Sequence, residues 1–166
     1  MRKHINGPIM ALILTIVRIW LGFHWVEAGY NKIKSGFDAG GFLQGAIANA
    51  SGAHPTVQGW YAGFLEGVAL PNIEFFNFLI PWGEFLVGLG LIIGLATIPA
   101  LIAGAFMNLN FMMAGMGLSG LDSKLFAAAV ILLFIGKGRY YYGLDRFIIP
   151  YFKNHLSAKR GILQIK

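Results

Sequence analysis

The sequence contains no cysteine, and only 12% of its 166 residues are charged. The missing cysteine excludes a disulfide framework, a dithiol relay and a thiolate-held metal or iron–sulfur cluster in this chain. No motif for a flavin, a nicotinamide or a metal is present either. A redox role would therefore require electrons to pass directly between bound substrates or through a partner protein.

Hydrophobic residues make up 57% of the chain, and the mean hydropathy is +0.65. This composition is typical of an integral membrane protein. The net charge of +6 comes from basic residues that flank apolar runs, as the positive-inside rule describes. We therefore expect a lipid bilayer as the environment and no nucleic acid as a partner. The first apolar run is too long for a signal peptide, so we expect it to be retained as a span.

Four apolar runs are long enough to cross a bilayer: 8–30, 75–95, 98–118 and 121–142. Most basic residues lie on the side of the two termini, which places both termini in the cytoplasm. The sequence thus predicts an all-α integral membrane protein, with residues 1–166 forming a single domain built as a four-transmembrane-helix bundle.

Residues 31–74 form one long outer loop, and loops of this length usually carry function or structure of their own. Within it, Trp60, Phe64 and Val68 fall at helical spacing after Pro55, which predicts a short helix over residues 56–70. This helix would lie on the outer membrane surface or pack over the bundle. Residues 143–166 form a basic, aromatic tail, which we expect to rest on anionic headgroups at the cytoplasmic face.

Polar residues of three spans fall at one depth. Counting about 1.5 Å per residue from the span ends places Arg18, Glu84, Asn108 and Asn110 near the bilayer centre. An unpaired charge there costs at least ~2.5–3.5 kcal/mol, so Arg18 is predicted to pair with Glu84, the asparagines supplying further hydrogen bonds. Such a pair either fixes helix packing without chemistry or marks a pathway, a proton relay or a ligand site.

A second polar group lies on the first span, where Trp20, His24, Glu27 and Asn31 share one face. Arg18 projects from nearly the opposite side of Glu27. These residues would form a polar stripe leading from the outer loop toward the depth of Arg18. His24 is either a satisfied interior histidine or a proton carrier. Haem held between two histidines of this chain is not expected, because the other histidines lie outside the spans.

Glycines gather in the first two spans. Small residues let membrane helices approach closely, so these glycines are predicted to serve helix packing. They are Gly22, Gly29, Gly83, Gly88, Gly90 and Gly94.

At these positions the sequence resembles the DoxX family, and within it the DoxD-like branch, the membrane subunit of thiosulfate:quinone oxidoreductase. The similarity runs from Arg18 to about Gly115, and the outer segment 60–72 also resembles that branch. It is carried by Arg18, Gly22, Phe23, Gly29, Lys32, Glu84, Gly88, Gly94 and the stretch NLNFMMAG. The resemblance implies a four-helix bundle in a prokaryotic cell membrane whose polar centre serves quinone-linked oxidation, with thiosulfate as one electron donor.

The resemblance turns the buried polar residues into a hypothesis for the site. Quinone reduction needs proton donors and groups that stabilise charge on a quinone oxygen, and carboxylates, histidines and arginines meet these needs. We expect Arg18 and Glu84 to form the catalytic centre, which His24 and Glu27 connect to the outer side. The residues expected to bind the quinone or substrate are Asn108, Asn110, Trp20, Trp25, Trp82, Phe111 and Lys32. Quinone would be the electron acceptor, and no bound metal, haem or flavin is expected.

Two other functions fit the same residues. One is a small-solute or proton-coupled membrane carrier, and the other is a non-catalytic assembly subunit of a redox complex. The expected protein partner is a second redox subunit or another copy of the chain.

Overall fold

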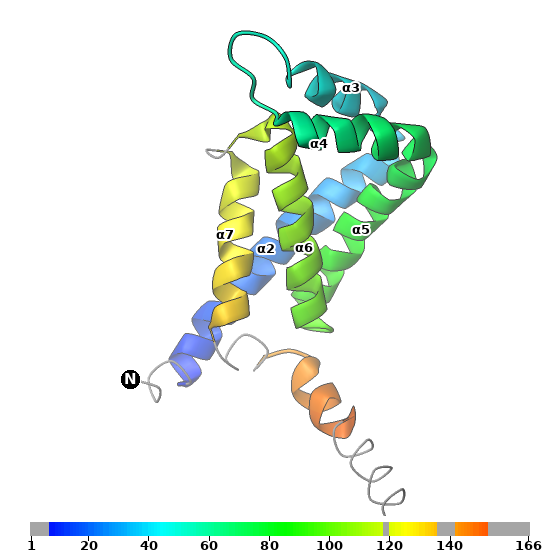
Figure 1. The fold of residues 1–166 in the computed structure, drawn as a ribbon. Helices are drawn as coiled ribbons and strands as arrows, with labels where there is room; N and C mark the ends of the chain where they lie inside the picture. Colours follow the sequence, from blue (N-terminus) through cyan, green and yellow to red (C-terminus); the bar gives the residue numbers. More distant parts are fainter. Residues whose placement is uncertain (1–6, 118–119, 136–141, 153–166) are drawn as a thin grey trace, which may run out of the picture.

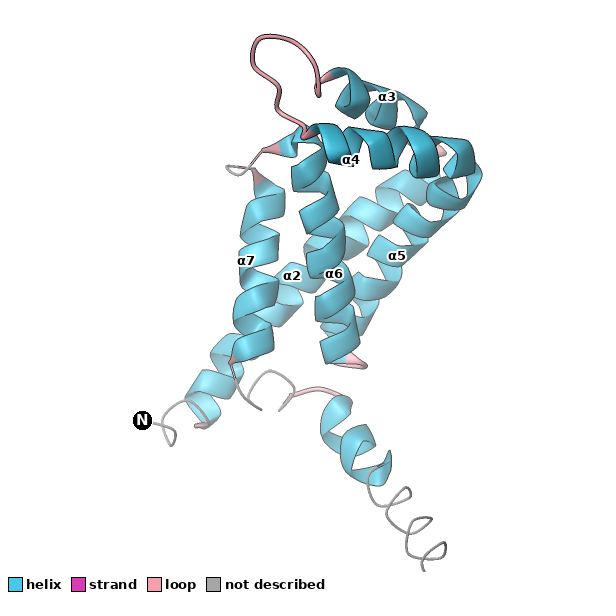
Figure 2. Cartoon of the chain, in the orientation of Figure 1, coloured by secondary structure: helices cyan, strands magenta, loops and turns pink. Residues whose placement is uncertain are grey.

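The computed structural model describes residues 7–117, 120–135 and 142–152, and these contain helices and connecting loops but no strand (Figures 1 and 2). Four helices form an elongated bundle. They are α2 (Pro8–Ser35), α5 (Ile73–Ile93), α6 (Thr97–Phe111) and α7 (Leu121–Phe134). The π-helical turn Met112–Met116 extends α6, and residues 145–152 form a further helix beyond the opposite end of the bundle.

The segment 36–72, which makes up most of the predicted outer loop, folds over one end of the bundle (Figure 1), and we keep the name outer loop for it. It contains α3 (Gly40–Ala48) and α4 (Gly59–Phe64), and α4 runs on through the turns Leu65–Ala69 and Leu70–Asn72 into α5. The helix predicted over 56–70 is therefore present, although it begins at Gly59.

The face of this helix that packs on the bundle is not the face that the spacing of apolar residues in the sequence indicated. Tyr61, Leu65 and Ala69 are buried, whereas Trp60 and Val68 remain 66% and 46% exposed. Of the three residues that suggested the helix, Trp60 and Val68 thus lie largely outside the contact with the bundle, whereas Phe64 lines a cavity between this helix and the bundle.

Three helices in the described part of the chain are long and apolar enough to span a membrane: Pro8–Ser35, Gly59–Ile93 and Thr97–Met116. They correspond to the first three predicted spans, although the second and third helices end at Ile93 and Met116, two residues before the predicted ends. The fourth predicted span, 121–142, begins with α7, but residues 136–141 lie outside the described residues. Four spans and cytoplasmic termini therefore stay predictions, as does the placement of tail residues 153–166, which are also outside the described part.

Helices α2 and α5 cross at very short range, because glycines line the contact. A Cβ added to Gly22 would lie 2.9 Å from the carbonyl oxygen of Gly88, and one added to Gly29 would lie 2.7 Å from that of Pro81. Only glycine leaves room for the opposite backbone at these distances. The predicted role of Gly22, Gly29 and Gly88 in packing is confirmed.

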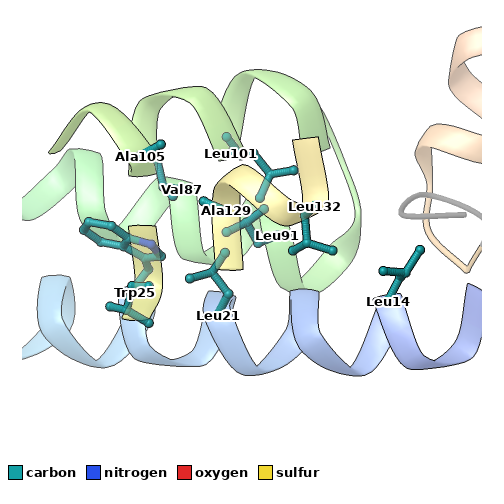
Figure 3. Packing of buried hydrophobic residues seen from close by; sticks show 11 residues of the cluster. Leu14, Leu21, Trp25, Val87, Leu91, Leu101, Ala105, Ala129 and Leu132 are labelled. Carbon is teal, nitrogen blue, oxygen red and sulfur yellow. The ribbon is translucent and has the colours of Figure 1, made fainter. Parts of the chain in front are cut away.

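Apolar side chains from all four bundle helices fill the core (Figure 3). Leu21, Leu91, Leu101 and Leu132 are fully buried and come from α2, α5, α6 and α7 in turn. Trp25 is 2% exposed and packs in the same core. This packing fixes the relative positions of the helices that carry the polar residues.

Candidate functional site

A polar cluster near the outer-loop end of the bundle takes one side chain from each of the four bundle helices. We call it the four-helix polar cluster; its members are Lys32, Glu84, Asn108 and Asp122. The Lys32 ammonium lies 2.5 and 2.7 Å from the two carboxylate oxygens of Glu84. The Glu84 side chain is 1% exposed and that of Lys32 is 29% exposed. This is a charged pair of which the carboxylate is wholly buried.

Asn108 and Asp122 complete the cluster. With the amide nitrogen of Asn108 facing Asp122, that nitrogen donates to Asp122 Oδ1 at 3.2 Å, and the amide oxygen accepts from the backbone N–H of Phe126 at 3.3 Å. Asp122 also interacts electrostatically with Lys32 and Glu84. The cluster thus holds two carboxyl groups and one ammonium group, so a single added proton would make it neutral. Such a set can take up and release a proton.

The glycine crossing explains why Lys32 reaches Glu84. Gly29 brings α2 against the backbone of α5 between Pro81 and Phe85, which flank Glu84. Lys32 follows Gly29 by one helical turn, and residues three apart project from the same side of a helix. The close approach therefore places the ammonium group beside the carboxylate.

Two aromatic rings border the ammonium group. Lys32 Nζ lies 5.6 Å from the ring centroid of Phe37 and 5.5 Å from that of Phe111, both within the range of a cation–π contact. The rings replace part of the hydration that the ammonium group loses on burial.

An apolar cavity of about 490 Å³ lies beside this cluster, between α5 and α6 and beneath α4. Its volume is in the range of small-molecule sites. Phe111 lines the cavity and also contacts Lys32, and Gly83, another lining residue, precedes Glu84 in the chain. The polar cluster and the cavity are therefore adjacent.

The polar atoms of the cavity come from Tyr61 and Asn110. The Tyr61 hydroxyl lies 3.1 Å from both the backbone and the side-chain carbonyl oxygens of Asn110, to either of which it can donate. The amide nitrogen of Asn110 donates to the Phe106 carbonyl at 2.8 Å. The other lining residues are almost all apolar, so the cavity suits a mainly hydrophobic molecule with a polar group at one end.

Arg18 does not belong to this site, and its predicted pairing with Glu84 is wrong. Arg18 is 1% exposed and lies against Gly94 and Gly143, and its Nη2 donates to the Tyr142 carbonyl at 2.7 Å. Gly94 follows Glu84 by ten residues, which is about 15 Å along α5. The depth count failed because α2 continues to Ser35, which brings Lys32 inside the bundle at the level of Glu84.

The carboxylate near Arg18 is Asp145. Asp145 accepts hydrogen bonds from the backbone N–H groups of Ala96 and Thr97, at 2.8 and 2.7 Å, where α6 begins. Its own N–H donates to the Gly94 carbonyl at 2.8 Å. Asp145 therefore caps α6 and ties the segment after α7 to the turn between α5 and α6.

We predict that Asp145→Ala lowers the free energy of unfolding by about 1–2 kcal/mol or more, because it removes the cap of α6 and the carboxylate near Arg18. Asp145→Asn keeps one acceptor and should cost less. The measurement is unfolding by SDS in mixed micelles, with the exposed Glu66→Ala as control. Equal stability of Asp145→Ala and Glu66→Ala would contradict this role.

The polar stripe of α2 faces outward. Trp20 is 41% exposed and stacks edge-to-face on His24, with ring centroids 4.9 Å apart, while Glu27 and Asn31 are also exposed. The structure brings none of these residues to Arg18 or to the four-helix polar cluster.

The tryptophans predicted to bind the quinone or substrate do not lie together either. Trp25 is part of the apolar core, and Trp82 is 42% exposed and packs against Phe78 and Phe85. Among the residues predicted to bind quinone or substrate, Asn110 and Phe111 line the cavity, while Lys32 and Asn108 belong to the adjoining cluster.

Two residues of the site were missed in the sequence. Asp122 is the second residue of the fourth predicted span, 121–142, and was not singled out among the polar residues of the spans. Tyr61 lies four residues before Leu65 and eight before Ala69, a helical spacing that would have identified the buried face of the outer helix.

Most of this architecture lies in a segment that matches a known family. A family model of DoxX matches residues 13–117, which is more than half of the chain and includes Lys32, Glu84 and Asn108. The chain belongs to the DoxX family. No curated protein and no solved structure matches it. DoxX membership and the three long apolar helices together indicate an integral membrane protein in a lipid bilayer.

Proposed function

We propose that this DoxX protein is the quinone-binding membrane subunit of a quinone-linked oxidoreductase, of the DoxD-like branch, in a prokaryotic cell membrane. The observation that carries the proposal is the apolar cavity of about 490 Å³ that has Tyr61 and Asn110 in its wall and adjoins the four-helix polar cluster. A quinone has the matching form, with an apolar isoprenoid tail and a ring bearing two carbonyl oxygens.

Entry from the bilayer is consistent with the lining of the cavity. Phe75, Leu79 and Phe106 line it and are 58%, 44% and 66% exposed. These side chains lie on the outside of the bundle, where lipid tails would contact them. A lipid-soluble molecule could therefore enter sideways without passing through water.

The residues present suit the proton chemistry of a quinone. Reduction adds two electrons and two protons to the quinone and gives a quinol. The Tyr61 hydroxyl and the Asn110 amide can hydrogen-bond a ring oxygen, and the adjoining Glu84 and Asp122 can exchange protons. Two thiosulfate ions would supply the two electrons as they join to form tetrathionate, either at this chain or at a second redox subunit.

Filling the cavity tests binding first. Ala103→Trp places a large ring at the cavity wall, and we expect it to weaken binding of a short-chain quinone at least roughly tenfold, measured in nanodiscs by equilibrium dialysis. Ile102→Trp, at the preceding position, is the matched control, because Ile102 is exposed and does not line the cavity; this variant should bind as the wild type does. Equal binding by both variants would reject the cavity as the quinone site.

Turnover is tested with Glu84→Gln, which keeps the shape of the side chain and one of its two acceptor oxygens but removes its charge. We expect quinone reduction, with thiosulfate and then sulfide as donors, to fall at least about 100-fold while the protein still folds. Binding without turnover in the wild type would indicate that a second redox subunit is required. If the wild type neither binds nor reduces quinone, the proposal fails. Solute uptake into sealed vesicles would then favour the carrier.

A further inference from the structure

The four-helix polar cluster reaches water at the end of the bundle that the outer loop covers, which we call the outer-loop end. The Lys32 side chain is 29% exposed, and Asp122, in the first turn of α7, is partly exposed. Glu84 and Asn108, by contrast, are 1% and 0% exposed. The last turn of α2 and the first turn of α7 both lie at the outer-loop end (Figure 1). The exposed members of the cluster therefore face that end.

Two apolar layers close the bundle in the opposite direction. In the layer nearer the cluster, each bundle helix contributes one buried apolar residue: Trp25, Val87, Ala105 and Leu125. Further along the same helices lie four leucines that are each 0% exposed: Leu21, Leu91, Leu101 and Leu132. Side chains of both layers lie together in the core (Figure 3). Their one polar side-chain atom is the indole nitrogen of Trp25, which can donate a hydrogen bond but cannot accept one. The layers therefore block proton transfer between the cluster and the end of the bundle where Arg18 lies.

The other charged side chains near the outer-loop end lie outside the cluster. Asp38 is tied to the start of α3, where its carboxylate accepts from the N–H of Gly40 at 3.0 Å. Lys34 and Lys124 are exposed, and α6 contributes only the neutral Asn108. The groups of the cluster that titrate together are therefore its one ammonium group and its two carboxyl groups.

We propose that the four-helix polar cluster is a proton site in which Glu84 and Asp122 share one proton beside Lys32, and that this site exchanges protons with water at the outer-loop end only. A proton from water adds to the partly exposed Asp122 carboxylate and moves within the cluster to Glu84, whose carboxylate also accepts from Lys32. The inference rests on the proposed function for the use of these protons, but not for their route.

Quinone reduction would then draw both of its protons from the outer-loop end. In the balanced reaction, one quinone, two thiosulfate ions and two protons give one quinol and one tetrathionate ion. The aqueous phase at the outer-loop end becomes more alkaline as the quinone is reduced, while the phase at the other end does not change.

Infrared spectroscopy tests the route without any quinone. The full-length protein is placed in liposomes with the outer-loop end outward, and only the external buffer is changed from alkaline to acidic. We expect the C=O band of the protonated cluster, identified by its loss in Glu84→Gln, to reach full amplitude before an ionophore equilibrates the lumen. Liposomes with the opposite orientation should need the ionophore. A band that does not depend on the orientation, or no band that depends on Glu84, would overturn the inference.

The share of Asp122 in the proton site is tested by Asp122→Asn, which keeps the shape of the side chain and an acceptor for Asn108. This variant leaves one carboxylate beside one ammonium group, so it should lose the C=O band as Glu84→Gln does, whereas Asp122→Glu should keep the band. The matched control is Glu66→Gln, which removes an exposed carboxyl group at the outer-loop end and should also keep the band. A band that persists in Asp122→Asn would overturn the sharing of the proton.

A second measurement follows the protons during turnover, with impermeant pH dyes on the two sides of the liposomes. Two protons per quinone should disappear from the side of the outer-loop end, and Asp122→Asn should lower kcat at least about tenfold without raising the KM for quinone. Protons drawn from the other side would overturn the inference. A wild type that reduces no quinone would instead reject the proposed function, and the infrared result then decides the proton route by itself.

Discussion

Replacing Lys32 with methionine is expected to lower the free energy of unfolding by roughly 3–5 kcal/mol, because it leaves the buried Glu84 carboxylate without its cation. Methionine keeps the length and much of the apolar stem of lysine, so the change removes mainly the charge. The loss should be large because Glu84 is 1% exposed and Asp122 adds a second carboxylate to the same cluster.

The control for this prediction is Lys34→Met, two residues further along the same helix. Lys34 is exposed, so its replacement should change stability by no more than about 0.5 kcal/mol. The measurement is again SDS-induced unfolding in mixed micelles. The double variant Lys32→Met with Glu84→Met should recover much of the loss, since it removes the uncompensated charge as well. If Lys32→Met is as stable as Lys34→Met, the ion pair does not stabilise the bundle.

Adding a single methyl group at Gly88 should destabilise the protein by about 3 kcal/mol. A Cβ at this position would lie 2.6 Å from the carbonyl oxygen of Gly22, and neither backbone can move without separating α2 from α5. Overpacking against rigid backbone typically costs about 1–3 kcal/mol and occasionally more, and this contact is at the severe end. Gly88→Ala should therefore reduce the fraction of monodisperse, folded protein after purification.

The matched control for Gly88→Ala is Gly45→Ala in α3, where a Cβ would meet no atom within 4 Å. Alanine is favoured over glycine inside a helix, so this variant should be neutral or more stable by about 0.5–1 kcal/mol. A Gly88→Ala variant as stable as Gly45→Ala would show that the two helices can separate at little cost. The coupling of their crossing to the Lys32–Glu84 pair would then also be in doubt.

The sequence by itself determined the membrane class and the positions of the first three long helices. Runs of about twenty apolar residues cross a bilayer as helices because every backbone polar group must be satisfied within the segment, so this information is local. The glycine crossing was also predictable, since small residues favour close packing of membrane helices. The same local reasoning placed Glu84 and Asn108 at one depth.

Only the tertiary structure decided which charges meet. Depth counting gives the level of a residue along the membrane normal, but the result depends on where each helix ends. It does not give the rotation of the helix about its own axis, which decides the side chains that face the bundle interior. Lys32 reaches Glu84 because α2 continues to Ser35 and crosses α5 at Gly29, while Arg18 packs instead near Gly94 and Asp145. The cavity beside Phe111 likewise depends on how α4 lies across α5 and α6, and such contacts between distant segments are not written in any one stretch of the sequence.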